Sequence, residues 1–544
     1  MSGQRVVVVT GGGGGIGAAI AEELGRRGDL VVTVDPLVTL DGQEQLPQSE
    51  ATTAERIAAA GGSARASSVS VTDGPAVEAL FGDLVEEHGR LDAVVNVAGI
   101  SRPTGYARGT ADDWRSVIAV HLDGYINVLG AALPLMASAG RGTVLGVTSG
   151  SGWRAADAGA YGCAKRAVAA LTWQLGAQAP PGVTVNAMSP IAMTRMVTAA
   201  LERSRGAAGS SAAGNLSLGS MPRPDELGPT GAHLVGDGFS WCSGQVIFAC
   251  GSEVAVIDPP RLLEVVRTTG TDRLAPALEA ASAAVLAPVE ALQASGGGSN
   301  SRTGAVGPTD ALPPAAVGSC LLVTDRPGVA ATVTAALAAR GVTTSTIGPA
   351  DPTTDFDGAA AALAAAVERD GVPDAVVVAL AGSPASPGSG GHGSDWKRVL
   401  AEHAGLADDL CIDAGWTRAA ADHAVRSSRQ LRLVTLVDAT SGGGRSRAQA
   451  SAQLARAAAS ATDGLVTSFS VSVETTVDAA GAVLGEVVAH LLCSPGAPGL
   501  AGAELVIAAD WFGLRSHPRA RGSVTFGGPA VPDWLDDALR GIVG

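Results

Sequence analysis

Residues 5–28, RVVVVTGGGGGIGAAIAEELGRRG, place an apolar run, a glycine turn and an alanine-rich helical pattern in direct succession. Four valines without polar alternation are typical of a strand buried on both faces. Gly11, Gly15 and Gly17 allow a tight turn, a close backbone approach to a ligand and contact between helix and strand. A run of glycines alone also suits a permissive loop. Its position between strand and helix predicts a dinucleotide pyrophosphate on the free amides at the helix start.

Similar apolar runs recur through the first half of the chain and alternate with helical patterns. They lie at 6–9, 31–34, 93–97, 143–147, 183–187 and 245–249. Buried strands alternating with helices predict a doubly wound α/β domain, in which helices cover both faces of a parallel sheet. We expect the ligand at the carboxyl ends of the strands.

Length and composition predict a globular protein of two or more domains. The chain has 544 residues, of which 46% are hydrophobic and 16% charged. A formal net charge of −15 argues against a nucleic-acid partner, which needs clustered Lys and Arg. Six dispersed cysteines without a CxxC pair favour reduced thiols over a metal site or disulfides. Without a signal-peptide core or a stretch of membrane-spanning length, we expect a cytoplasmic protein and no membrane partner.

A polar Gly/Ser-rich segment divides the chain. We place a flexible linker at 294–317, between a domain at 1–293 and another at 318–544. A second small-residue segment, 204–220, is predicted to be a loop within the first domain and a candidate lid.

The two halves also repeat each other in order. LDAVVNVAG (91–99) is similar to PDAVVVALAG (373–382), and DDWRSVIAVHLDG (112–124) to SDWKRVLAEHAGL (394–406). The repeat predicts two Rossmann-like domains in tandem.

Asp35 follows the second apolar run. A carboxylate at this position accepts hydrogen bonds from the adenosine ribose hydroxyls and repels a 2′-phosphate, which favours NAD over NADP. The alternative is an Asp that starts a turn with Pro36.

Tyr161 and Lys165 lie one helical turn apart, twelve and sixteen residues after Ser149. On one helix face, a lysine ammonium is expected to lower the pKa of the tyrosine toward the range of a general acid/base. Ser149 would then hold the substrate oxygen, while hydride moves to or from nicotinamide. Taken alone, such a pair is an ordinary feature of a helix surface.

In order, TGGGGGIG (10–17), Asp35, NVAG (96–99), Ser149, YGCAK (161–165) and VTVNAMSPIAMT (183–194) resemble the short-chain dehydrogenase/reductase superfamily. The resemblance covers about residues 4–270 and implies an NAD-dependent oxidoreductase that interconverts a secondary alcohol and a ketone. It implies the catalytic residues Ser149, Tyr161 and Lys165 and the cofactor contacts Gly11, Gly15, Ile16, Gly17, Asp35, Asn96, Gly99, Tyr161, Lys165, Pro190 and Thr194.

Two departures from the family pattern matter for the site. His121 stands where the family has an Asn that helps to hold a relay water, and VHLDG (120–124) resembles the 3-hydroxyacyl-CoA dehydrogenase units of peroxisomal multifunctional enzymes. His121 is therefore either a relay residue or a half-buried helix histidine. The interval from Ser149 to Tyr161 is one residue short, so Ser151 remains an alternative to Ser149.

The second half resembles the same fold without its catalytic residues. Asp325 and Pro327 occupy its turn, and residues 437–460 hold neither Tyr nor Lys. We expect this half to be a non-catalytic internal partner in an intramolecular pseudo-dimer, with further homo-oligomers possible; a regulatory or acyl-binding domain is the alternative. The expected substrate is a small apolar alcohol or ketone, an acyl thioester or a hydroxysteroid. A non-catalytic dinucleotide sensor or scaffold is the alternative function.

Overall fold

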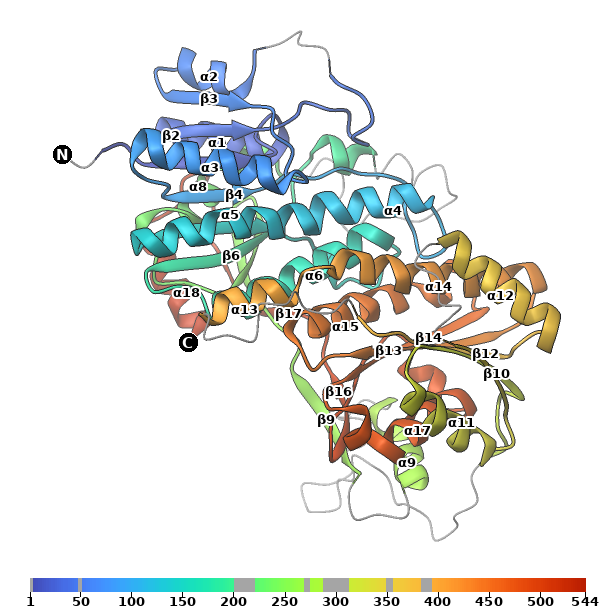
Figure 1. The fold of residues 1–544 in the computed structure, drawn as a ribbon. Coiled ribbons are helices and arrows are strands. Elements are labelled where there is room, and N and C mark those ends of the chain that lie inside the picture. The colour runs from blue at the N-terminus through green and yellow to red at the C-terminus, as the bar shows by residue number, and fades with distance from the viewer. Residues whose placement is uncertain are drawn as a thin grey trace.

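The computed structural model describes residues 3–46, 51–199, 221–268, 274–286, 313–348, 356–382 and 394–544. The expected lid at 204–220 and residues 294–312 of the expected linker lie outside these ranges. Two sheets, each covered by helices, make up the described chain (Figure 1).

The first sheet has nine strands, and the seven consecutive strands from β7 to the edge strand β3 pair in parallel. From edge to edge they are β17 (Arg519–Thr525), β8 (Glu253–Asp258), β7 (Val246–Cys250), β6 (Val183–Pro190), β5 (Gly142–Val147), β4 (Ala93–Asn96), β1 (Val6–Thr10), β2 (Leu30–Val34) and β3 (Ser63–Ser67). The six apolar runs predicted as strands are confirmed as β1, β2, β4, β5, β6 and β7.

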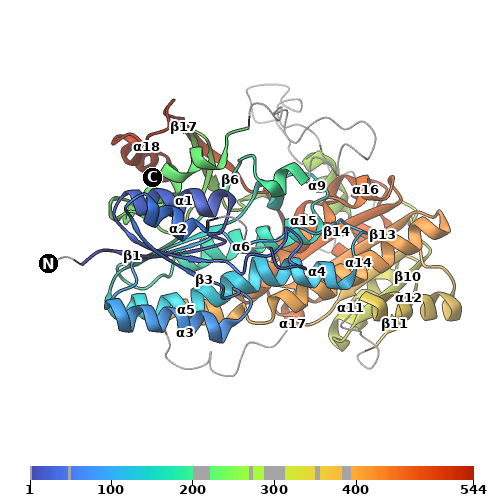
Figure 2. The same cartoon turned by 90° about the horizontal axis from the view of Figure 1, so that it is seen from above.

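Helices cover both faces of this sheet (Figure 2). On one face lie α1 (Gly15–Arg26), α8 (Gly228–Leu234) and α18 (Leu535–Val543); the short α2 (Thr53–Ala59) contacts α1. On the other lie α3 (Gly74–His88), α4 (Ala111–Ile118), α5 (Gly124–Ala139) and α6 (Gly159–Gly176). The doubly wound α/β architecture is thus confirmed.

The second sheet has eight strands and follows a similar order of crossovers. Its strands are β11 (Thr343–Ile347), β10 (Ser319–Thr324), β12 (Ala375–Ala379), β13 (Leu431–Asp438), β14 (Val466–Val473), β15 (Glu504–Ile507), β16 (Trp511–Arg515) and β9 (Leu262–Arg267). The six from β11 to β15 pair in parallel, and β16 and β9 are antiparallel.

The helices of the second half also occupy both faces of their sheet. α9 (Leu274–Leu286), α11 (Pro327–Ala338) and α17 (Val477–Cys493) pack on one face, and α12 (Phe356–Asp370), α13 (Asp395–Glu402), α14 (Leu406–Ser427) and α15 (Gly442–Ala455) on the other; α16 (Ala458–Ala461) follows α15.

The two halves exchange their edge strands. After β8 the chain passes through Pro259 and Pro260 into β9, which pairs with β16 of the second sheet. After β16 it passes through Pro518 into β17, which pairs with β8 of the first sheet. Figure 1 shows β9 beside β16, and Figure 2 shows α18 with the first half. The expected boundaries at 293 and 318 therefore do not separate the two sheets.

One apolar core spans both halves. It joins helices α3 to α6 of the first half to α12, α14 and α15 of the second, and α6 packs along α15. Within the described ranges, the run Ala111–Ala139 is long and apolar enough to cross a membrane, but 61% of its most apolar window is buried in the protein.

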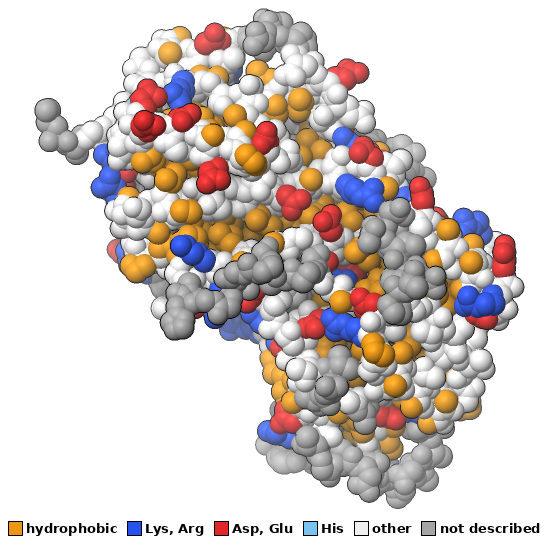
Figure 3. All heavy atoms as spheres, viewed as in Figure 1, with side chains coloured by type: hydrophobic (Ala, Val, Ile, Leu, Met, Phe, Trp, Pro, Cys, Tyr) orange, Lys and Arg blue, Asp and Glu red, His pale blue; other side chains and the backbone are white. Residues whose placement is uncertain are grey.

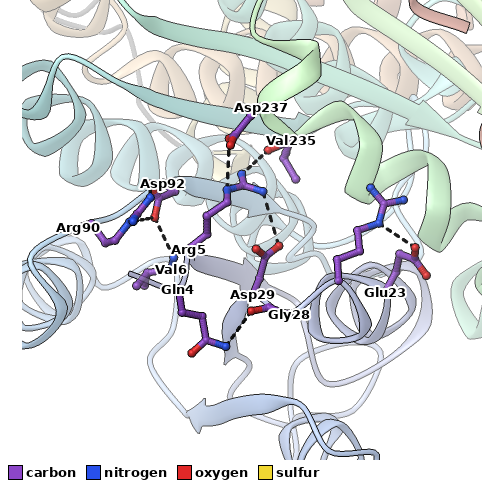
Figure 4. A network of polar contacts seen from close by, with 11 residues as sticks. Gln4, Arg5, Val6, Glu23, Gly28, Asp29, Arg90, Asp92, Val235 and Asp237 are labelled. Carbon is purple, nitrogen blue, oxygen red and sulfur yellow. Dashed lines mark hydrogen bonds and ion pairs between the residues drawn. The ribbon is translucent and has the colours of Figure 1, made fainter. Parts of the chain in front are cut away.

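Polar contacts anchor the end of the first sheet opposite the glycine turn (Figure 4). Arg5 donates to the Val235 carbonyl at 2.6 Å and lies 3.7 Å from Asp29. Asp92 accepts from the Val6 amide at 2.9 Å. On the face drawn in Figure 3, acidic and basic side chains lie scattered among apolar and small ones.

Candidate active site

The glycine turn between β1 and α1 requires glycine at two positions. Gly11 has a φ of +65°, and a Cβ there would lie 2.7 Å from the Ala98 amide nitrogen. A Cβ on Gly17 would lie 2.2 Å from the Gly11 carbonyl oxygen. Helix α1 begins after Gly14 with no side-chain cap, so its first amides face the turn unblocked by a side chain. Ile16 packs on the core beside them. This arrangement fits a pyrophosphate.

Asp35 lies beside this turn at the end of β2. Its Oδ2 accepts from the Gly13 amide at 2.9 Å, and its Oδ1 accepts from the Leu37 amide at 2.8 Å. Each carboxylate oxygen keeps further acceptor capacity, which two ribose hydroxyls can use.

Asn96 and Gly99, which the family resemblance implies as cofactor contacts, lie at and just after the end of β4. The Asn96 Oδ1 accepts from the Thr10 hydroxyl at 2.7 Å, so it joins β4 to β1 next to the glycine turn. A Cβ on Gly99 would lie 2.4 Å from His121 Cε1. Glycine at position 99 therefore leaves the space that the His121 imidazole fills.

Ser149 and Tyr161 meet at the end of β5. The Ser149 side chain acts on the Tyr161 phenol in the direction that lowers its pKa, and it accepts from the Ser151 amide at 3.2 Å. The Ser151 hydroxyl instead accepts from Arg154 at 3.5 Å. Of the two serines, Ser149 is thus the partner of the phenol.

Lys165 lies one turn along α6 and is buried. Its Nζ donates to the Val147 carbonyl at 2.5 Å and lies 5.8 Å from the centre of the Tyr161 ring. Burial lowers the pKa of Lys165 to about 7. The chain has two lysines, Lys165 and Lys397, and its Lys and Arg residues are otherwise all arginines.

The electrostatics of Tyr161 differ from the prediction. Burial raises the pKa of the phenol, while the hydrogen bond from Ser149 and the charge of Arg154 act in the lowering direction. The predicted lowering by Lys165 is not seen, because desolvation outweighs the lowering contributions and the lysine ammonium is not one of them. Arg154 carried no recognisable sequence signal.

His121 lies on a π-helical turn, Ala119–Asp123, that joins α4 to α5. Its Nε2 lies 2.8 Å from the Ile100 carbonyl and must carry the hydrogen, because a carbonyl only accepts. Its ring meets the Tyr161 ring edge-on, with centres 5.1 Å apart. Burial lowers the pKa of His121 to about 3, so the ring is neutral, and its Nδ1 is a buried acceptor without a hydrogen-bond partner in the described chain.

Pro190 and Thr194 lie at the carboxyl end of β6, on the side of the glycine turn. Pro190 is the last residue of the strand. A Cβ on Gly15 would lie 3.7 Å from Thr194 Cγ2, and one on Gly14 would lie 3.4 Å from an Arg195 nitrogen. The predicted site residues therefore come from seven separate segments of the first half.

The first half of the chain is similar in sequence to known proteins. Residues 5–205 match the family model described as short chain dehydrogenase. The chain is 33% identical over 256 residues to the short-chain reductase protein NovJ of Streptomyces niveus, an alignment of 46% of this chain and 94% of that protein. The chain belongs to the short-chain dehydrogenase family. Its first half is therefore that of an oxidoreductase.

The first half is also similar to two other known proteins. Over 194 residues the short-chain dehydrogenase half is 34% identical to the peroxisomal hydratase-dehydrogenase-epimerase of Saccharomyces cerevisiae, covering 35% of this chain and 21% of that protein. A solved structure, actinorhodin polyketide ketoreductase with NADPH, is 28% identical with a TM-score of 0.40, covering 46% of this chain and 97% of that one.

In the second half, polar side chains bond to one another at the equivalent end of the sheet. Asp325 accepts from the Ala381 amide at 3.0 Å, and Arg326 lies 3.1 Å from Asp438. Pro327 begins α11 and has no backbone N–H that could donate to a ligand. His403 matches His121 in the sequence repeat. Its Nδ1 donates to the Val399 carbonyl at 2.7 Å, and its Nε2 accepts from the Ser446 hydroxyl at 2.8 Å.

Proposed function

We propose that the first half interconverts a secondary alcohol and a ketone with NAD(H). One observation carries the proposal: Lys165 lies one turn along α6 from Tyr161 with its Nζ 5.8 Å from the centre of that ring, and the Ser149 side chain acts to lower the pKa of the same phenol. A nicotinamide dinucleotide, when bound, would accept or supply the hydride.

The side chains then divide the remaining work. The Tyr161 phenol exchanges a proton with the substrate oxygen, and Ser149 donates a hydrogen bond to that oxygen. The buried Lys165 Nζ would hold a ribose hydroxyl and the phenolate once it exchanges its contact with the Val147 carbonyl. The unpartnered His121 Nδ1 accepts from a water that carries protons away from Lys165.

The choice of NAD follows from Asp35. Its amide contacts orient a carboxylate beside the turn, where a 2′-phosphate would meet a negative charge. A 3-hydroxyacyl thioester is the preferred substrate class, supported by the similarity to the peroxisomal dehydrogenase. A hydroxysteroid or another apolar secondary alcohol is the alternative outcome.

The second half is proposed to be a degenerate copy of the first that takes the place of a partner subunit. Its strand order, the sequence repeat around Trp396 and His403, and the reciprocal exchange of β9 and β17 support this. So does the packing of α6 along α15, which buries the helix that carries Tyr161 and Lys165.

The test is the absorbance of NADH during incubation with NAD and a panel of 3-hydroxyacyl thioesters, hydroxysteroids and simple secondary alcohols. We expect turnover by the wild type with NAD in preference to NADP, and loss of at least about a hundredfold in Tyr161→Phe. Binding of NAD by both proteins without turnover of any panel member would favour the dinucleotide sensor and overturn the oxidoreductase.

A further inference from the structure

The turn that follows Ser149 is held from the second half of the chain. This turn, Gly150–Gly152 with Trp153 and Arg154, leads from Ser149 toward the helix that carries Tyr161. The Nε2 of Gln453, on α15, donates to the Ser151 carbonyl at 3.0 Å and to the Arg154 carbonyl at 2.9 Å. Arg456, just beyond α15, donates to the Trp153 carbonyl.

The hydrogen bonds from Gln453 and Arg456 add to those that the turn makes within itself. The amides of Gly152, Trp153 and Arg154 bond to carbonyls within the turn, at 2.9, 3.1 and 2.9 Å. The carbonyls of Ser151 and Trp153 instead accept from Gln453 and Arg456. Gln453 is 4% exposed, so its side-chain amide is buried and makes its hydrogen bonds to the carbonyls of this turn.

The turn has little freedom on its other side. A Cβ on Gly152 would lie 2.9 Å from the Arg166 amide nitrogen, so the turn lies directly on α6. The Ser149 Oγ accepts from the Ser151 amide, and the plane of the next peptide is set by the bond from Gln453 to the Ser151 carbonyl. The direction of the serine hydroxyl is thereby linked to α15.

We propose that Gln453 and Arg456 are positioning residues that hold the Ser149 hydroxyl on the Tyr161 phenol, which makes the second half a working part of the active site. The role in turnover rests on the proposed oxidoreductase function, but the placement of Ser149 does not. A displacement of about 1 Å in such a group costs on the order of a hundredfold in rate.

The test compares Gln453→Met with Gln174→Met. Both glutamines join the first half to α15: Gln453 through the Ser149 turn, and Gln174, on α6, through donation to Ser446 Oγ at 3.0 Å and to the Gly442 carbonyl at 3.3 Å. Gln174 has no contact with the Ser149 turn. Methionine keeps the volume, removes the donors and adds no charge, so the two variants are matched in their cost to the interface.

One readout does not need a substrate. The chain has three tyrosines, and burial raises the pKa of both Tyr106 and Tyr125 strongly. In the folded protein, phenolate absorbance on raising the pH therefore reports Tyr161. Because the Ser149 hydrogen bond lowers the pKa of the phenol, we expect Gln453→Met to raise the pKa of Tyr161, by less than Ser149→Ala does, while Gln174→Met leaves it unchanged.

With a panel substrate, Gln453→Met should lower kcat by roughly tenfold or more with little change in KM for NAD. Equal effects of the two variants, or no effect of Gln453→Met on either readout, would overturn the positioning role. If Gln453→Met does not fold, Arg456→Met takes its place under the same criteria. A wild type inactive on every panel member would defeat the proposed function, yet the titration would still decide this inference.

Discussion

The imidazole of His121 occupies the space in which a side chain at residue 99 would lie. A Cβ built on Gly99 falls 2.4 Å from His121 Cε1, and the same ring meets Tyr161 edge-on. A small residue at the end of β4 and a large one on the π-helical turn are therefore a matched pair. Their fit holds the imidazole against the phenol that we propose as the acid/base.

Gly99→Ala tests this fit. The added methyl group must displace the ring, so we expect a loss of about 1–3 kcal/mol in the free energy of unfolding, measured in urea. Gly99→Ala combined with His121→Asn should lose less than the sum of the single exchanges. Gly130→Ala on α5 is the control, because a Cβ there would contact no described atom. Additive losses in the double variant would contradict the steric account.

Asp35→Asn tests the choice of cofactor. Removing the carboxylate charge should reduce the preference for NAD over NADP at least about tenfold, which corresponds to ~1.4 kcal/mol. The measurement is kcat/KM for the two cofactors with one substrate. Asp73→Asn, at an exposed cap of α3, removes the same charge elsewhere and should leave the ratio unchanged. An unchanged ratio in Asp35→Asn would remove Asp35 from cofactor selection.

Asp123 makes stability depend on pH. It lies between the halves, and burial with the nearby charge of Asp408 raises its pKa to about 6 from 3.8. Below pH ~4 the carboxyl is protonated in both states; as pH rises to about 6 the unfolded state ionises first, so the native state loses stability. Asp123→Asn should raise the melting temperature at pH 7 and leave it nearly unchanged at pH 4. Exposed Asp83→Asn should show no such difference.

Arg166 and Glu504 join the halves by a buried ion pair next to Lys165. Glu504→Leu leaves a buried guanidinium without its carboxylate, and we expect a loss of about 3–5 kcal/mol in the free energy of unfolding. Arg166→Leu combined with Glu504→Leu should be less destabilised than Glu504→Leu alone. A full double-mutant cycle by urea unfolding measures the coupling free energy between the two side chains. A coupling free energy of zero would show that the two charges do not depend on each other.

The C-terminal helix α18 completes the core of the first half. Leu539 is fully buried there, whereas Trp534 at the start of the helix is 49% exposed. Leu539→Ala should cost about 2–5 kcal/mol in the free energy of unfolding. Trp534→Ala should change it by less than about 0.5 kcal/mol. Equal losses would mean that α18 does not depend on its apolar face for docking.

Much of the fold could be predicted from the sequence, because the patterns that indicate its strands and helices are local. The valine run at 6–9, the glycines after it and the four-residue interval from Tyr161 to Lys165 each lie within a few turns of chain, where periodicity reflects burial directly. The π-helical turn at His121 was not readable, since its sequence also suits an ordinary helix. The direction of the Tyr161 pKa was not readable either, because desolvation depends on what packs over the ring.

The parallel sheet and the glycine turn after β1 could be predicted from the sequence, because both depend on neighbours along the chain. The exchange of β9 and β17 between the sheets, and the influence of Ser149 rather than Ser151 on the pKa of the Tyr161 phenol, emerge only from the folded chain. So does the contact of Gln453 with a carbonyl 302 residues away. Such contacts depend on how two complete surfaces pack. The sequence pattern of one segment does not predict which surface will pack against it.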